Sequence, residues 1–269
     1  MVRFPAVAGA FYPANPKQLK EQVEEYLEES TRAEPVRAKA CLVPHAGYMY
    51  SGHVAGAVFG EIEIPRTILL LGVRHAARGA DLAIMSEGAW RTPLGDVPIA
   101  EELAKRLKAA CTALEEDEVA HEREHSLEVE LPFLQVRRPE VRFVPVAVGG
   151  LDLDELVRTG EEMGRVVRES EEEILIVTSS DLNHYEDEAT TQEKDRNAIA
   201  KLEEMDARGL YEVCRRERIS MCGLGPSVVA LSALKRMGAK KGRLVRHATS
   251  GEVNGDYKAV VGYAGMIFE

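Results

Sequence analysis

Imidazole and carboxylate side chains follow directly after three apolar segments of this chain. These side chains are His45, His75 and the neighbouring pair Asp181 and His184. Such groups bind metals and transfer protons near neutral pH. One polar loop residue alone is usually a helix cap or a solvated side chain. Three segments that end in this way favour a shared site, with metal binding or acid–base catalysis as its chemistry.

Cys222 is a candidate of a different kind. It lies in the glycine-rich stretch Ser220–Gly225, just before a helix that Pro226 is expected to open. The dipole of a helix favours a thiolate at the N-terminus, which suits a metal ligand or a nucleophile. A buried turn cysteine would explain the same residues. The spacing alone leaves both interpretations open. The glycines do not form a dinucleotide fingerprint, because Val228 stands where the third glycine belongs.

The stretch His121–His125 matches the H-x-x-E-H signature of a group of zinc peptidases. In that signature two histidines on one helix bind zinc and the glutamate acts as a base. The match is short and lies among many acidic residues, and Pro132 follows soon after it. We therefore rank the peptidase hypothesis low. We expect His121 to be partly exposed and not to share a metal with His125.

Alternating strands and helices must position these side chains. A first helix is predicted from Pro16, with Asn15 as its N-cap. The expected strands are Ala40–Val43, Thr67–Leu71, Leu82–Met85, Val141–Val148, Ile174–Thr178, Arg243–His247 and Ala259–Phe268. The further expected helices are Val54–Phe59, Ala100–Cys111, Leu127–Gln135, Leu153–Arg168, Ala189–Met205 and Pro226–Met237.

Several of these strands are continuous apolar runs, which is typical of strands that are covered on both faces. The sequence therefore predicts an α/β fold, a single domain over residues 1–269, with a central mostly parallel or mixed sheet and helices on both faces. In open α/β sheets, ligands bind at the carboxyl ends of the strands. His45, His75 and Asp181 are expected to meet at that edge.

The overall composition excludes some classes of function. The chain has 269 residues, with 34 Lys and Arg against 45 Asp and Glu, and its net charge is −11. An acidic surface repels phosphate backbones, so nucleic-acid binding is not expected. No apolar run approaches the roughly 18 residues that a membrane span needs. The first residues, Met1–Pro5, lack the apolar core of a signal peptide, so we expect a cytoplasmic protein.

Motifs along nearly the whole chain resemble those of the Memo-like family, the protein B component of the AmmeMemoRadiSam system. The match runs from residue 4 to the last expected strand. It rests on Pro5–Pro13, Pro44–Gly52, Leu71–His75, Arg91–Asp96, Glu124–Pro132, Ser179–Tyr185 and Cys222–Gly223. The family is related to the class III, LigB-type extradiol dioxygenases, which are non-heme iron enzymes. A LigB-like fold is what this resemblance implies.

The resemblance also implies a metal site. His45, His75 and Cys222 would hold the ion, with Asp181 and His184 beside it as catalytic residues. His125 and Glu128 would be structural or would support the ligands. The implied cofactor is a redox-active or divalent metal, with iron or copper ahead of zinc. The implied partners are an unidentified small molecule and, in prokaryotes, radical-SAM and AMMECR-type proteins.

The third ligand departs from the dioxygenase pattern. Those enzymes bind iron with two histidines and a carboxylate, whereas the resemblance puts Cys222 in the carboxylate's place. A thiolate is softer and can itself be oxidised. The leading hypothesis is a metal-dependent redox enzyme or oxygenase in which His184 is the general acid or base and Asp181 orients it. The alternative is a non-catalytic metal- or ligand-binding protein that acts through partner proteins.

Overall fold

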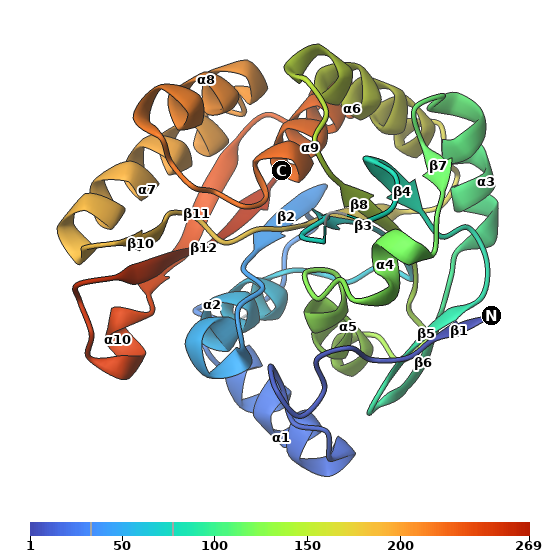
Figure 1. The fold of residues 1–269 in the computed structure, drawn as a ribbon. Coiled ribbons are helices and arrows are strands. Elements are labelled where there is room, and N and C mark those ends of the chain that lie inside the picture. Colours follow the sequence, from blue (N-terminus) through green and yellow to red (C-terminus); the bar gives the residue numbers. More distant parts are fainter. Residues whose placement is uncertain (33, 77) are drawn as a thin grey trace.

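A mixed sheet of nine strands forms the centre of the computed structural model, which describes residues 1–32, 34–76 and 78–269 (Figure 1). The strands run in the order β10-β12-β2-β9-β3-β8-β4-β7, and β11 also pairs with β12. Their bounds are β2 (Ala40–Val43), β3 (Thr67–Val73), β4 (Leu82–Ile84), β7 (Glu115–Glu116), β8 (Arg142–Val148), β9 (Ile174–Ser179), β10 (His184–Glu186), β11 (Gly242–Thr249) and β12 (Val260–Phe268).

The middle of the sheet is parallel. β2, β9, β3 and β8 run side by side in the same direction, and nearly every residue in them is buried. β12 is antiparallel to β2, and β4 is antiparallel to β8. Strands covered on both faces read as continuous apolar runs, which is why the sequence revealed them. The predicted α/β class with a mixed central sheet is confirmed.

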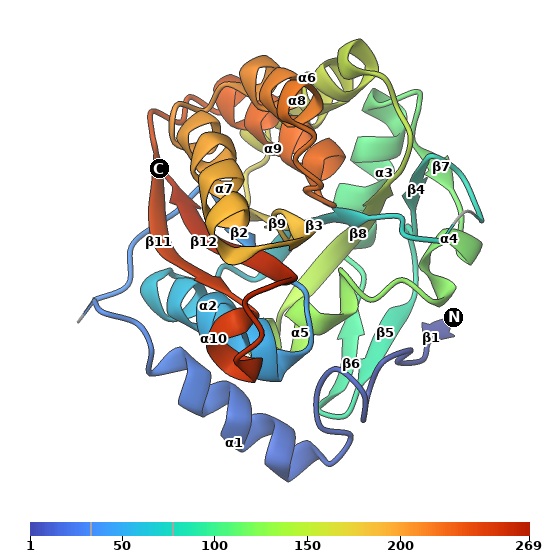
Figure 2. The same cartoon turned by 60° about the vertical axis from the view of Figure 1, so that its left-hand side comes forward.

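Helices pack on both faces of this sheet. Figure 2 shows α6, α8 and α9 on one side and α1, α2 and α5 on the other, while α7 packs on β11 and β12. The helices are α1 (Pro16–Leu27), α2 (Tyr48–Glu61), α3 (Glu101–Ala110), α4 (Val119–Glu122), the 3₁₀ turn η1 (Glu128–Glu130), α5 (Leu131–Arg137), α6 (Leu153–Arg168), α7 (Glu188–Glu203), α8 (Ala207–Glu217), α9 (Leu224–Arg236) and α10 (Gly251–Asn254).

A small second sheet holds the N-terminal segment. It has the order β1-β5-β6, with β1 (Val2–Arg3), β5 (Ala89–Thr92) and β6 (Gly95–Pro98). The buried carboxylate of Glu128 accepts hydrogen bonds from the Arg3 guanidinium, from two backbone N–H groups and from the hydroxyl of Tyr12. Glu128 therefore has the structural role that the family resemblance implied.

The element bounds follow the local signals. α1 begins at Pro16, and the side chain of Asn15 accepts hydrogen bonds from the next backbone N–H groups, as predicted. α8 was not predicted. Its buried face consists of Leu210, Val213 and Cys214 only, a stripe too narrow to stand out among charged neighbours. Within the described residues, no helix combines the length and apolar character that crossing a membrane requires.

Candidate metal centre

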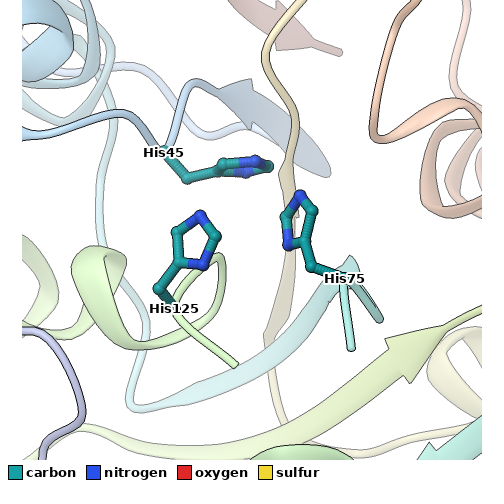
Figure 3. A group of neighbouring side chains, drawn as sticks. All are labelled: His45, His75 and His125. Atoms are coloured by element: carbon teal, nitrogen blue, oxygen red, sulfur yellow. The ribbon is translucent and has the colours of Figure 1, made fainter. Parts of the chain in front are cut away.

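Three histidines from separate parts of the chain meet at the carboxyl edge of the sheet (Figure 3). Each of His45, His75 and His125 offers one ring nitrogen, and these nitrogens lie within 4.8 Å of one another. The rings of His75 and His125 are stacked, with centroids 4.6 Å apart, and both stand close to His45. These three nitrogens are therefore candidate ligands for one metal ion, which histidine binds at roughly 2.0–2.1 Å.

His45 lies two residues beyond β2 and is almost fully buried. Its Nδ1 is 2.8 Å from Ser179 Oγ, and its backbone N–H donates to Asp181 Oδ1 at 2.8 Å. The ring is thus fixed through Nδ1, which leaves Nε2 to face the site. Burial, aided by repulsion from His125 and His75, holds the pKa of His45 well below its usual range. The imidazole is therefore neutral and ready to bind a metal at pH 7.

His75 follows β3 and is held by one buried carboxylate. Glu124 accepts a hydrogen bond from the backbone N–H of His75 at 2.8 Å and lies 2.9 Å from its Nδ1. Burial alone would raise the pKa of Glu124, but the hydrogen bonds and charge of His75 outweigh it and lower that pKa to about 2. An ionised carboxylate on Nδ1 fixes the tautomer that presents Nε2 and makes it a stronger ligand.

His125 comes from the loop between α4 and η1, which lies against β3. The hydroxyl of Ser126 accepts from the backbone N–H of Val73 at 3.0 Å. A Cβ at Gly72 would stand 2.7 Å from side-chain atoms of Leu127 and Ser126, so glycine permits this close approach. On its other side, the ring of Phe11 packs 5.0 Å from that of His125. The family resemblance implied a structural or supporting role for His125, whereas the structure makes it a candidate ligand.

Cys222 stands at the edge of this group, in the turn before α9. Its Sγ lies 3.2 Å from His45 Nε2 and accepts from the Asp181 backbone N–H at 3.3 Å. Burial, together with the nearby charge of Asp181, raises the pKa of the thiol far above its ordinary value. The helix dipole does not overcome that burial, so the expected thiolate is disfavoured until a metal replaces the proton. Its role as third ligand stays a prediction.

Asp181 lies two residues beyond β9 and His184 begins β10, and their roles as catalytic residues stay a prediction. Asp181 is buried, and its Oδ2 lies 4.0 Å from His45 Nε2. Burial raises its pKa, which the hydrogen bond from His45 partly offsets. His184 is half-buried in β10, and its Nδ1 lies 3.0 Å from the carbonyl oxygen of Ser220. That carbonyl can only accept, so His184 Nδ1 is the donor of this hydrogen bond and Nε2 takes no part in it.

His121 does not join the site, and the expectation that it is partly exposed is wrong. It is fully buried in α4, and its ring packs edge-on against Trp90. α4 ends at Glu122, so His121 and His125 do not share a helix as the peptidase signature requires. Because His125 instead faces His45 and His75, the described residues do not form the peptidase site.

The donor set fits a metal ion. Two imidazoles have their Nδ1 atoms anchored by Ser179 and Glu124 and their Nε2 atoms left for coordination. A third imidazole and a thiol are close by. Such nitrogen and sulfur ligands suit iron, copper and zinc rather than magnesium or calcium. Fold and site together define an α/β protein with a candidate metal centre at the carboxyl ends of its parallel strands.

The chain belongs to the Memo-like protein family. The family's sequence profile matches residues 3–267. A MEMO1 family protein from Methanopyrus kandleri is 41% identical over 280 residues, covering 100% of this chain and 99% of that protein. One from Aquifex aeolicus is 41% identical over 268 residues and covers 99% of each chain. The family resemblance seen in the motifs is thereby confirmed.

A solved structure supports the fold. An uncharacterized protein from Escherichia coli K12 superimposes with a TM-score of 0.55 at 12% identity, covering 86% of this chain and 100% of that one. At that level of identity the likeness concerns the α/β fold alone.

Proposed function

We propose that this protein is a metal-dependent redox enzyme or oxygenase. The observation that carries the proposal is the convergence of His45, His75 and His125, with the Cys222 thiol 3.2 Å from His45 Nε2. His45 and His75 would hold the ion together with Cys222, and His125 competes with Cys222 for the third place. Iron or copper would supply one-electron chemistry to a bound substrate, and zinc is the further candidate for the site.

Residues of this chain, His184 and Asp181, can assist proton transfer in such a reaction. His184 Nδ1 is fixed on the Ser220 carbonyl, so Nε2 can accept a proton from a substrate hydroxyl and later return it. Asp181 positions the backbone of His45 and stands beside its ring. Its carboxyl group thereby supports the ligand, and it is the next candidate to coordinate the metal itself.

Metal content and oxygen consumption test the proposal together. The protein is purified without oxygen, its metal is measured, and oxygen uptake is followed with a panel of catechol-type substrates. His45→Ala should lose the metal. His184→Ala should keep it but lose about 10²-fold or more in turnover, as removal of a general acid or base does. His53→Ala, a half-buried histidine of α2 outside the group, is the matched control and should retain both properties.

One alternative belongs to another class of function. A metal-loaded protein that consumes no oxygen with any substrate would favour a non-catalytic metal- or ligand-binding protein that acts through partners. Radical-SAM and AMMECR-type proteins are the partners to examine first, and co-purification from a native source would test them. The chain's membership of the Memo-like family supports both the catalytic and the non-catalytic role.

A further inference from the structure

A second candidate site lies at the opposite, amino edge of the parallel strands. It is a pocket of about 730 Å³ lined by five arginines. These are Arg37, Arg66, Arg137, Arg138 and Arg142. Arg66 directly precedes β3 and Arg142 begins β8, and the two strands are paired with Thr67 opposite Arg142. The chain as a whole has a net charge of −11, whereas this pocket is rich in positively charged guanidinium groups.

The carboxylates in the pocket do not neutralise these arginines. Glu63 binds Arg37, and Glu172 binds Arg142 and the hydroxyl of Thr67. Glu173 also lines the pocket, and Glu140, which does not line it, pairs with Arg138 at 2.9 Å, so four carboxylates accompany the five arginines. Arg142 and Thr67 already donate hydrogen bonds to Glu172. These bonds fix the three side chains in one wall of the pocket.

Two arginines are left without a carboxylate partner. In the part of the chain that the structure describes, neither Arg66 nor Arg137 has an acidic group within 4.0 Å, although the charge of Arg66 helps to lower the pKa of the nearby Glu172. Arg137 is half-buried; its Nη2 donates to the Ile62 carbonyl at 3.1 Å, and its buried Nε has no hydrogen-bond partner among the described atoms. Burial lowers the pKa of Arg137, but a guanidinium stays charged in proteins. An unpaired, half-buried cation of this kind is costly without an anion.

We propose that this pocket binds a phosphate-bearing small molecule. The guanidinium groups come from the residue before β3, the start of β8, the end of α5 and the segment before β2, so they approach from several directions. A tetrahedral phosphate accepts hydrogen bonds on all sides, whereas a planar carboxylate is satisfied by one or two arginines. The volume falls within the range of small-molecule sites and exceeds what one phosphate needs. The pocket therefore has room for a ligand larger than inorganic phosphate.

Calorimetric titration with pyrophosphate tests this site in the full-length protein. We expect saturable one-to-one binding at 50 mM salt that weakens at 300 mM. Arg66→Gln and Arg137→Gln should each weaken it about tenfold, since each removes a charge-assisted hydrogen bond. Arg66 is exposed, so Arg66→Gln should fold normally. This variant keeps the test valid even if Arg137→Gln, which loses the hydrogen bond to the Ile62 carbonyl, does not fold. Arg196→Gln, on the exposed surface of α7, is the matched control.

Three results would overturn the proposal. The first is the absence of saturable pyrophosphate binding to the wild type at millimolar concentrations. The second is equal weakening by Arg196→Gln, which would show attraction to the whole surface. The third is citrate binding as tightly as pyrophosphate, which would make the pocket a general anion site. Metal binding at His45 is measured alongside and should be the same in all these variants, since this inference does not depend on the metal centre.

Discussion

The third ligand position decides the charge of the metal centre. With His45, His75 and His125, all ligands are neutral and the ion keeps its full positive charge. With Cys222 in place of His125, a thiolate removes one unit of that charge and makes the site softer. Both side chains are within reach of His45, and they differ in one measurable respect: only the thiol must release a proton to bind.

Proton release upon metal binding tells the two arrangements apart. Because burial raises the pKa of Cys222, the thiol is protonated at pH 7, and coordination by sulfur should release about one proton. Cys222→Ser should release about one proton fewer per zinc ion and bind zinc more weakly. Calorimetry in buffers of different ionisation enthalpy, without oxygen, measures this number. Equal proton counts in the wild type and Cys222→Ser would assign the third place to His125 or Asp181.

The burial of His121 should make the stability of the folded protein depend on pH. Burial, with repulsion from Arg3, lowers its pKa to about 4, against 6.5 in an unfolded chain. Between these values the unfolded chain binds more protons, so stability should fall as the pH drops from 6.5 to 4, by about 3 kcal/mol from this residue.

His121→Leu tests that contribution, because leucine has no proton to bind. Urea unfolding at several pH values should show a shallower fall between pH 6.5 and 4 for the variant than for the wild type. Other titrating groups are common to both proteins and cancel in the difference. Parallel curves would mean that His121 does not supply this dependence.

At the scale of elements, the contact between β3 and the loop after α4 places His125. Gly72→Ala should push that loop away, because the added Cβ would lie 2.7 Å from Ser126 and Leu127. We expect about 1–3 kcal/mol of destabilisation, as for other overpacked sites, and weaker metal binding. Gly150→Ala is the control, since its Cβ would meet only Asp81 at an ordinary 3.8 Å. Unchanged metal affinity in Gly72→Ala would argue against His125 as a ligand.

The sequence predicted the site residues that follow strands, and it missed His125 as a candidate ligand, because His125 lies in a loop. His45, His75 and Asp181 were found because buried parallel strands have a clear apolar pattern and end at one edge. His125 follows no strand, and its place depends on Gly72 and Ser126 fitting together, which periodicity does not encode. His121 was expected to be partly exposed, and its full burial was missed because short motifs do not report burial. The glutamate between them, Glu124, was a usable signal, since carboxylates commonly orient metal-binding histidines.

At the scale of the whole molecule, a bound metal should stabilise the fold. It would join the end of β2, the end of β3 and the loop after α4. A metal at 100 times its dissociation constant adds about 2.7 kcal/mol to stability. For a chain of this size we expect a rise in Tm on the order of 5 °C. Scanning calorimetry with and without a chelator measures it. His45→Ala should show no rise, and an equal rise in that variant would place the metal elsewhere.

The two candidate sites occupy opposite edges of one buried sheet. The paired strands between them, β3 and β8, are each seven residues long, which corresponds to roughly 23 Å. One small molecule does not span that distance. Any influence of one site on the other would have to pass through the packed strands.

The long separations within the metal centre bear on how it forms. His45 and Cys222 are 177 residues apart in sequence, and β2 pairs with β9 and with β12 near the far end of the chain. Contacts at such separations form slowly and late in folding. An unfolded chain therefore offers its histidines and thiols as scattered single ligands, and a metal present at that stage can trap wrong combinations of them. Reconstitution should follow a fixed sequence of steps: refold first under a chelator and a reductant, then supply the ion.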